Sequence, residues 1–226
     1  MDHHVKELPY GVQDFLTIVE QNIYYVDKTQ YIPKLESEAR NLFFIRPRRF
    51  GKSLFISMLM AYYDCYTKDK FQQWFGNLWI GQHPTPLQGR YQVLHLDFSQ
   101  VGGTIEQLEE NFNTYCRISL NDFMDKYAAS YPEETRKAFY ASDNAGEKLA
   151  IMTRKAQSLR IPLYLIIDEY DNFTNTVLNE LGEETYWKMT HAEGFYRDIF
   201  KKFKGNFDRI FMTGVSPVTL DDVTSG

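Results

Sequence analysis

The chain has 226 residues, a formal net charge of −5 at pH 7, and 43% hydrophobic and 16% aromatic residues. This composition can supply a sizeable core, so it excludes a disordered chain and fits one large domain or one domain with an appendage. The acidic balance argues against a dedicated nucleic-acid-binding protein, whose binding surface is usually basic.

Cysteine content and the chain's start bear on where the protein works. Cys65 and Cys116 are far apart and form no C-x-x-C pair, which is typical of a reduced, intracellular protein. The first residues, MDHHVKELPYG, lack the apolar segment of a signal peptide. No stretch approaches the ~20 apolar residues of a membrane span. We therefore expect a soluble, cytoplasmic protein with no membrane partner.

Residues 1–40 are expected to form an N-terminal extension that packs on the core rather than a domain of their own. Within them, residues 23–37 begin with a β-like aromatic run, IYYV. The run is followed by apolar residues at a spacing that predicts a short helix, at Tyr31, Ile32 and Leu35. The core is then expected to span residues 41–226.

The core alternates between two patterns. Four apolar runs predict strands, at residues 41–46, 91–99, 162–171 and 208–217. Helical segments are predicted between them, at residues 52–66, over most of 104–160, and around 184–203. Strands separated by helices imply right-handed βαβ crossovers and a parallel sheet. Ligands of such sheets bind beyond the carboxyl ends of the strands, so polar residues at those ends are the candidates for function.

The segment FFIRPRRFGKSLF, residues 43–55, joins the first strand to the first core helix. It ends like the phosphate-binding loop G-x-x-x-x-G-K-[ST], but Arg46 stands where that loop has its first glycine. In the phosphate interpretation, Gly51 lets the backbone approach a phosphate closely. Lys52 reaches the β- and γ-phosphates, and the Ser53 hydroxyl binds Mg²⁺.

The alternative is a solvated basic turn, and helix electrostatics argue against it. Cations at a helix N-terminus oppose the helix dipole, at about 0.3–1 kcal/mol each when exposed. A group of them there makes sense if an anion normally binds among them. The candidate nucleotide-binding residues are Arg48, Arg49, Phe50, Gly51, Lys52, Ser53 and Leu54.

The third predicted strand, in LYLIIDEYD, ends in two carboxylates, Asp168 and Glu169. In phosphate-loop NTPases an aspartate at this place helps to hold Mg²⁺, and an adjacent glutamate can activate the attacking water as a general base. The alternative is a charged loop that closes a buried strand. The upstream GKS makes the catalytic interpretation the favoured one.

Two further polar residues end predicted strands. Thr213 could hydrogen-bond the γ-phosphate or the attacking water, or it could be an ordinary threonine before a glycine turn. Asp97 could support the site or bind substrate, and it could equally cap the next segment. Histidines and cysteines form no cluster at metal-ligand spacing. The tyrosines are expected to pack in the core and in grooves rather than to stack on bases.

Five segments carry a family resemblance: LPYGVQDFLTIVEQNIYYVDKTQYIPKL, FFIRPRRFGKSLFISML, HLDFS, LIIDEYDNF and IFMTGVSPV. They resemble the predicted AAA-ATPase-like family of bacterial proteins, in the family's order and over nearly the whole chain. The resemblance implies a P-loop NTPase three-layer sandwich with a mainly parallel sheet, of the additional-strand, catalytic-glutamate type, that binds ATP and Mg²⁺. The family's own loop is similar to R-P-R-R-F-G-K-S, so Arg46 is a family trait.

The resemblance also implies roles for single residues. It implies a phosphate loop at Gly51, Lys52 and Ser53, with Ser53 and Asp168 at the Mg²⁺ ion. It implies Glu169 as the catalytic base and Thr213 as the sensor of the γ-phosphate. The YYVDKT segment matches a family motif near the nucleotide, with no firm role for its aspartate or lysine.

The chain departs from the family at its end. Family members continue into another strand, a helical lid and often a nuclease-like region, whereas this sequence stops at Gly226. We therefore expect the last core strand and any nuclease to be absent. No arginine finger can be assigned, and Arg197 and Arg209 are candidates by location alone.

Three hypotheses follow for function. The first is an Mg²⁺-dependent ATPase that cleaves the γ-phosphate. The second is a module that binds ATP or ADP as a switch, hydrolyses little, and acts through a protein partner or self-association. The third is a small-molecule phosphotransferase, whose acceptor pocket could come from Asp97 and residues 104–160.

Overall fold

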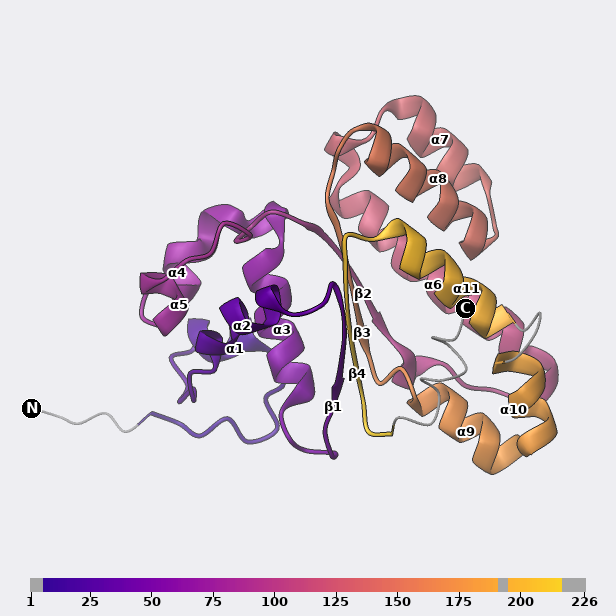
Figure 1. Ribbon diagram of the computed structural model, residues 1–226, viewed down its shortest axis with the longest axis horizontal. Coiled ribbons are helices and arrows are strands. Elements are labelled where there is room, and N and C mark those ends of the chain that lie inside the picture. Colours follow the sequence, from indigo (N-terminus) through magenta and orange to yellow (C-terminus); the bar gives the residue numbers. More distant parts are fainter. Residues whose placement is uncertain (1–5, 191–194, 217–226) are drawn as a thin grey trace, which may run out of the picture. The chain divides into compact units, whose positions relative to one another are not determined.

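The computed structural model describes residues 6–190 and 195–216 of the chain. It divides into two compact units, which we call the helical unit and the sheet unit (Figure 1). The helical unit comprises Met1–Ala39 and Arg49–Tyr91, and the sheet unit comprises Arg40–Arg48 and Gln92–Gly226.

The described part of the sheet unit contains a four-stranded sheet. Its strands are β1 (Asn41–Ile45), β2 (Gln92–Asp97), β3 (Leu163–Asp168) and β4 (Arg209–Gly214), in the order β1-β4-β3-β2. Every neighbouring pair is parallel. The four predicted strands and the parallel sheet are therefore confirmed, and each strand is shorter than predicted. An α/β fold with this sheet fits a P-loop-like sandwich.

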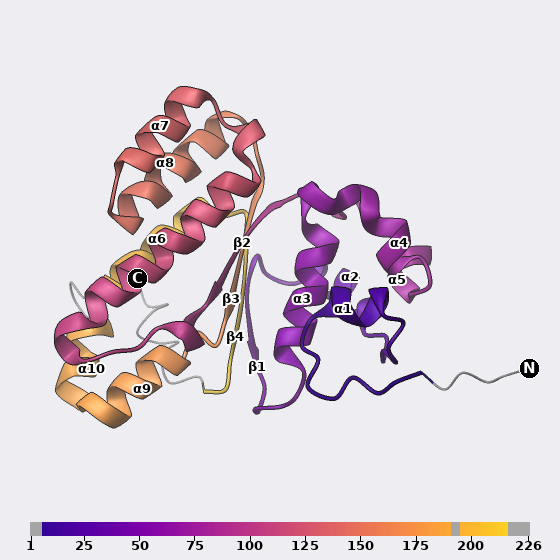
Figure 2. The same cartoon turned by 180° about the vertical axis from the view of Figure 1, so that it is seen from behind.

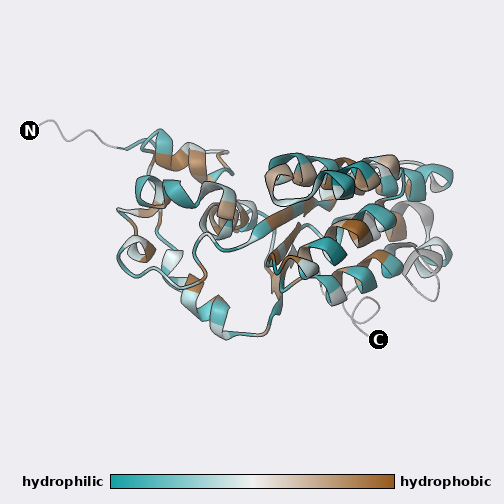
Figure 3. Cartoon of the chain, turned by 90° about the horizontal axis from the view of Figure 1, so that it is seen from above, coloured by the Kyte–Doolittle hydropathy of each residue, from teal (hydrophilic) through white to brown (hydrophobic). Residues whose placement is uncertain are grey.

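The strands are buried because of their composition. All six residues of β3, LYLIID, are buried, as is typical of a parallel strand covered on both faces. Hydrophobic residues gather on the strands (brown in Figure 3). In register, Asp97 lies opposite Asp168 and Ile45 opposite Gly214. The carboxyl ends of all four strands therefore meet at one edge of the sheet.

Helices connect the strands of the sheet unit. Between β2 and β3 the chain forms η3 (Phe98–Gln100), η4 (Ile105–Gln107), α6 (Leu108–Lys126), η5 (Ala128–Ser130), α7 (Glu133–Ala141) and α8 (Ala145–Ser158). Between β3 and β4 it forms α9 (Asn172–Leu181), α10 (Glu183–Thr190) and α11 (Phe195–Asn206). The helical predictions for 104–160 and 184–203 are confirmed, with residues 191–194 outside the description. Figures 1 and 2 show α6, α8 and α11 on the same side of the sheet.

Aromatic side chains fill the space between these helices and the sheet. The Phe98 ring lies 5.3 Å from that of Phe112 on α6 and 6.0 Å from those of Tyr196 and Phe200 on α11, and all four side chains are buried. Aromatic pairs at these distances stabilise the packing beyond their buried area. The cluster joins the end of β2 to both helices.

The described helical unit contains α1 (Phe15–Glu20), η1 (Thr29–Tyr31), α2 (Ile32–Ser37), α3 (Lys52–Tyr63), η2 (Cys65–Lys70), α4 (Phe71–Phe75) and α5 (Trp79–Gln82). The predicted helices near residues 31–35 and 52–66 are confirmed as α2 and α3. The β-like interpretation of the aromatic run is wrong, because residues 23–28 belong to no strand. The Asp27 carboxylate instead turns the chain: it accepts hydrogen bonds from the Thr29 N–H (2.8 Å) and hydroxyl (2.6 Å).

Helix α1 is fixed to α3 by a polar contact as well as by packing. The Asp14 carboxylate caps α1 by accepting from the Thr17 N–H at 2.8 Å, and its other oxygen accepts from the Ser57 hydroxyl on α3 at 2.7 Å. The Phe15 ring stacks on Phe75 at 4.9 Å. The helix that follows the predicted phosphate loop is therefore anchored one turn and a half from its start.

The expected division into an extension (residues 1–40) and an ATPase core (41–226) stays a prediction. In the structure, the described residues up to Ala39 group with Arg49–Tyr91. Among the described helices, none combines the length and the apolar character needed to cross a membrane.

Candidate nucleotide-binding site

The predicted phosphate loop turns through left-handed backbone conformations. Gly51 is the N-cap of α3 with φ 75° and ψ 27°. A Cβ there would meet no atom within 4 Å, so the conformation rather than space favours glycine. Arg49 also has a positive φ, of 65°, which is uncommon for a residue with a side chain. The turn from β1 into α3 therefore depends on two left-handed residues.

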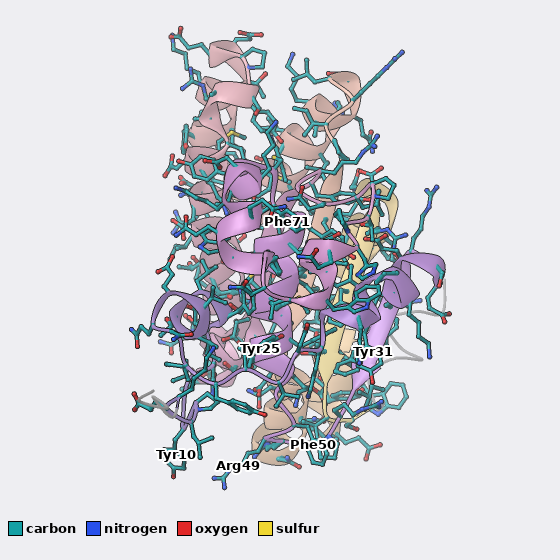
Figure 4. The ribbon with its side chains drawn as sticks, turned by 90° about the vertical axis from the view of Figure 1, so that its left-hand side faces the viewer. Tyr10, Tyr25, Tyr31, Arg49, Phe50 and Phe71 are labelled. Carbon is teal, nitrogen blue, oxygen red and sulfur yellow. The ribbon has the colours of Figure 1, made fainter. Side chains whose placement is uncertain are left out.

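The cations predicted for this loop flank the start of α3 in sequence, and one of them, Lys52, is buried. Arg48, Arg49 and Phe50 are exposed, and Lys52 is the first residue of the helix. Figure 4 shows Arg49 and Phe50 at the lower end of the helical unit in that view. The first helical hydrogen bond runs from the Phe55 N–H to the Gly51 carbonyl, at 3.0 Å. Helix N-termini of this kind offer N–H donors and partial positive charge to an anion.

Ser53 and Leu54, which complete the predicted loop, are half-buried on the first turn of α3. The helical unit thus brings Arg49, Phe50, Gly51, Lys52, Ser53 and Leu54 together, while Arg48 belongs to the sheet unit.

In the sheet unit, the ends of β3 and β4 are joined through Asp168. Its Oδ1 accepts a hydrogen bond from the Thr213 hydroxyl and another from the Glu169 N–H at 3.0 Å. The Tyr170 N–H also donates to the Thr213 carbonyl at 3.0 Å. Asp168 and Thr213 are both buried. The structure brings these two predicted residues into contact and fixes the orientation of the carboxylate.

Glu169 follows Asp168 with φ 49°, in the left-handed region. A residue with a Cβ pays about 1–2 kcal/mol for this conformation. Such strain is concentrated at functional sites, where the surrounding structure imposes it. The Glu169 carbonyl accepts from the Asn172 N–H at 2.9 Å, which starts the turn into α9. The half-buried side chain of Glu169 therefore leaves the sheet edge in a direction set by an unfavourable backbone.

Sequence reasoning missed Asp171, which organises the segment after β4. Its buried carboxylate accepts from the N–H groups of Val215 (2.9 Å) and Ser216 (2.5 Å). A Cβ on Gly214 would lie 2.5 Å from Tyr170 Cε1 and 2.6 Å from Asp171 Oδ1, so only glycine fits. The signal in the sequence was the third acidic residue of DEYD together with the glycine of TGVS.

Tyrosines complete this anchoring. The Tyr170 hydroxyl donates to the Ser216 carbonyl at 2.6 Å, and the Tyr196 hydroxyl on α11 donates to the Tyr170 carbonyl at 2.5 Å. Burial, with a contribution from Asp171, raises the pKa of Tyr196 well above its usual value, so the hydroxyl keeps its proton and its donor role. Contacts from the turn after β3, from α11 and from the segment after β4 therefore fix the sheet edge beside Thr213.

The contacts of Asp97 support the interpretation of this residue as a cap of the next segment. Its oxygens accept from the Ser99 N–H (3.0 Å) and the Gln100 side-chain amide (3.2 Å), so Asp97 caps η3. Two residues earlier, burial lowers the pKa of His95, although Asp168 and Asp97 act in the opposite direction.

The two arginine-finger candidates differ in place. Arg209 is the first residue of β4, at the opposite end of the strand from Thr213 and Gly214, so it does not lie at the candidate edge. Arg197 lies on α11.

The fit of the predicted Mg²⁺ site can be tested on the donor chemistry of the described residues. Among the described residues, no group of three or more His, Cys, Asp or Glu side chains could hold a metal ion. Mg²⁺ needs fewer, because it keeps several waters and binds one or two carboxylates together with substrate phosphates. The buried, oriented carboxylate of Asp168 fits that donor set.

A protein-family model described as "Predicted AAA-ATPase" matches residues 9–224. The chain belongs to the AAA-ATPase-like family. Membership in this family supports nucleotide binding. The predicted loop and the ends of β3 and β4 lie within the matched residues, and the roles of their single residues stay predictions.

A curated relative is an "Uncharacterized protein in vnfD 5'region" from Azotobacter chroococcum mcd 1, with 49% identity over 55 residues. That alignment covers 24% of this chain and 11% of the relative. No solved structure matches this AAA-ATPase-like chain.

Proposed function

We propose that this chain binds ATP with Mg²⁺ and hydrolyses its γ-phosphate, as a P-loop ATPase of the catalytic-glutamate type. The observation that carries the proposal is the start of α3. Gly51 caps this helix in a left-handed conformation, directly before Lys52 and Ser53 and six residues after a parallel strand ends. Family membership supports the same function.

In the proposal, the loop binds the triphosphate. The N–H groups of the first turn of α3 and the Lys52 ammonium contact the β- and γ-phosphates. The exposed Arg48 and Arg49 add positive charge at the entry of the site, which explains why cations gather at a helix end that otherwise disfavours them. Phe50 and Leu54 flank the loop.

The ends of β3 and β4 supply the chemistry in this proposal. Glu169 orients a water molecule and accepts its proton as the water oxygen attacks the γ-phosphorus. The bond from that phosphorus to the β–γ bridging oxygen breaks, and the products are ADP and inorganic phosphate. Thr213 fixes Asp168 and contacts the γ-phosphate or the water. Ser53 and Asp168 would hold Mg²⁺, which neutralises charge on the phosphates when bound.

Calorimetric titration of the full chain with ATP, ADP and GTP, with and without Mg²⁺, tests binding. We expect Mg²⁺-dependent binding of ATP, and loss of that binding in Lys52→Ala. Lys137→Ala is a control at an exposed lysine of α7 that pairs with Glu133, whereas Lys52 is buried, so equal melting temperatures of the two variants are needed to exclude misfolding. If none of the three nucleotides binds, the proposal is wrong.

Phosphate release tests hydrolysis. Glu169→Gln should bind ATP as the unchanged protein does and lose turnover, whereas Glu133→Gln, an exposed control on α7, should change neither. If ATP binds but Glu169→Gln leaves turnover unaltered, the hydrolase proposal fails and the nucleotide switch is favoured. Turnover only upon addition of an acceptor would indicate a phosphotransferase.

A further inference from the structure

A pocket of about 190 Å³ lies within the helical unit, beside the first turn of α3. Its apolar walls come from two segments, the N-terminal region and α3, through Pro9, Tyr24, Tyr25, Val26, Leu54 and Phe55. Gly51 and Lys28 also line it. The pocket thus shares Gly51 and Leu54 with the predicted phosphate loop.

The N-terminal wall is held in place by contacts that do not involve a ligand. The Tyr24 N–H donates to the Glu7 carbonyl at 2.8 Å, and the Asp27 carboxylate accepts from the Trp79 N–H at 2.7 Å. The Tyr25 ring meets Phe15 edge-on at 5.4 Å, and Tyr25 lies near the middle of the view in Figure 4. Pockets that bind small ligands are usually preformed in this way.

The size and the lining of the pocket suit an aromatic group. Two tyrosine rings, a proline and aliphatic side chains offer stacking and apolar contact, and the volume is small compared with pockets for drug-sized ligands, which are about 300–1,000 Å³. Lys28 adds one polar side chain. Burial raises the pKa of Tyr25 far above its usual value, so the Tyr25 hydroxyl stays uncharged.

We propose that this pocket holds the base of the nucleotide whose phosphates bind at Gly51, Lys52 and Ser53. The proposal rests on the proposed function, since it assigns the second half of the same ligand. The base stacks on Tyr24 or Tyr25 and contacts Val26 and Leu54, and the ribose bridges from the pocket to the loop. The YYVDKT segment then has two functions: its aspartate shapes the wall and its aromatic residues bind the ligand.

A comparison of two ligands distinguishes binding in the base pocket from binding at the phosphate site. The full chain is titrated with Mg·ATP and with Mg-tripolyphosphate, which has the phosphates and no base. Stacking of the base on an aromatic side chain is worth roughly 5- to 150-fold in affinity. We therefore expect the unchanged protein to bind ATP more tightly than tripolyphosphate.

Variants of exposed residues keep the test independent of folding. Tyr24→Ala and Val26→Asp should weaken ATP binding within that range and leave tripolyphosphate binding unchanged. The matched control is Tyr31→Ala, because Tyr31 is 50% exposed and Tyr24 is 49% exposed, and Tyr31 does not line the pocket. Equal melting temperatures would show that all three variants are folded.

The outcomes are distinct. If ATP and tripolyphosphate bind equally well, or if the two pocket variants leave ATP affinity unchanged while Lys52→Ala abolishes it, the base pocket is wrong and the phosphate site stands. If neither ligand binds the unchanged protein, the proposed function fails, and the base pocket fails with it.

Discussion

Replacing Glu169 with glycine should make the folded protein more stable while removing its proposed catalytic base. Glu169 has φ 49°, which costs a residue with a Cβ about 1–2 kcal/mol. Glycine adopts this conformation without strain, but its unfolded chain has more entropy, which costs about 0.5–1 kcal/mol. The difference is a gain of about 0.5–1 kcal/mol, or roughly 1–4 °C in melting temperature for a chain of this size.

Urea and thermal unfolding of three variants measure this gain. Glu169→Gln keeps the Cβ and should match the unchanged protein in stability. Arg160→Gly is the matched control, because Arg160 has φ 56° in the exposed turn between α8 and β3, at the opposite end of β3 from Asp168 and Glu169. It should gain the same stability as Glu169→Gly and leave nucleotide turnover unaltered.

A loss of stability in Glu169→Gly would refute this reasoning. The clearest contradiction would be a stabilised Arg160→Gly beside a destabilised Glu169→Gly. The Glu169 side chain would then stabilise the fold, and the left-handed backbone would not be strain held at a functional site.

Three further predictions concern stability and reactivity. Asp171→Ala removes a buried carboxylate that accepts from two part-buried N–H groups and should lower the unfolding free energy by about 3–5 kcal/mol in urea titration; a loss below about 1 kcal/mol would contradict the anchoring role. Asp14→Ala should cost about 1 kcal/mol and Asp14→Asn less, since asparagine also caps helices. Burial acts to raise the pKa of Asp14, but the hydrogen bonds that its carboxylate accepts outweigh burial and leave the pKa below 3.8. The stability that Asp14 contributes is therefore complete above pH 3.8 and is lost as the pH falls through the folded-state pKa. Unfolding of both variants across pH 2–6 checks the sign. Burial raises the pKa of Cys116 to about 12, so a thiol reagent should modify the half-buried Cys65 first and Cys116 only on unfolding, which peptide mass mapping would show.

The strands were predictable because buried parallel strands consist of continuous apolar runs. A parallel strand covered on both faces must be largely apolar. Strand β3 has its one charged residue, Asp168, at its carboxyl end, and β4 is apolar between Arg209 at its start and Thr213 near its end. Parallel order then places Asp97, Asp168 and Thr213 at one edge without any knowledge of the helices. The loop before α3 was also predictable, because the pattern Gly-Lys-Ser between a strand and a helix is a short local motif.

Other features depend on partners distant in sequence. Asp171 binds N–H groups 44 and 45 residues away, and the acidic residue and the glycine that mark the two segments do not by themselves show that they pair. The aromatic run of residues 23–28 has strand-like composition, yet Asp27 binds Thr29 and Trp79 and bends it. The positive φ of Glu169 is likewise imposed by its surroundings. Propensity was overridden there by tertiary contacts.

The anchoring of the segment after β4 also limits its length. Asp171 reaches the N–H groups of two consecutive residues, and Gly214 leaves no room beside it for a Cβ. One inserted residue between Thr213 and Ser216 would displace these donors by about 3.3 Å, beyond hydrogen-bond reach. Surface loops elsewhere in the chain tolerate added residues at small entropic cost. The segment from Thr213 to Ser216 is therefore a fixed-length spacer, in which a deletion or insertion should be more damaging than a substitution at its exposed position, Val215.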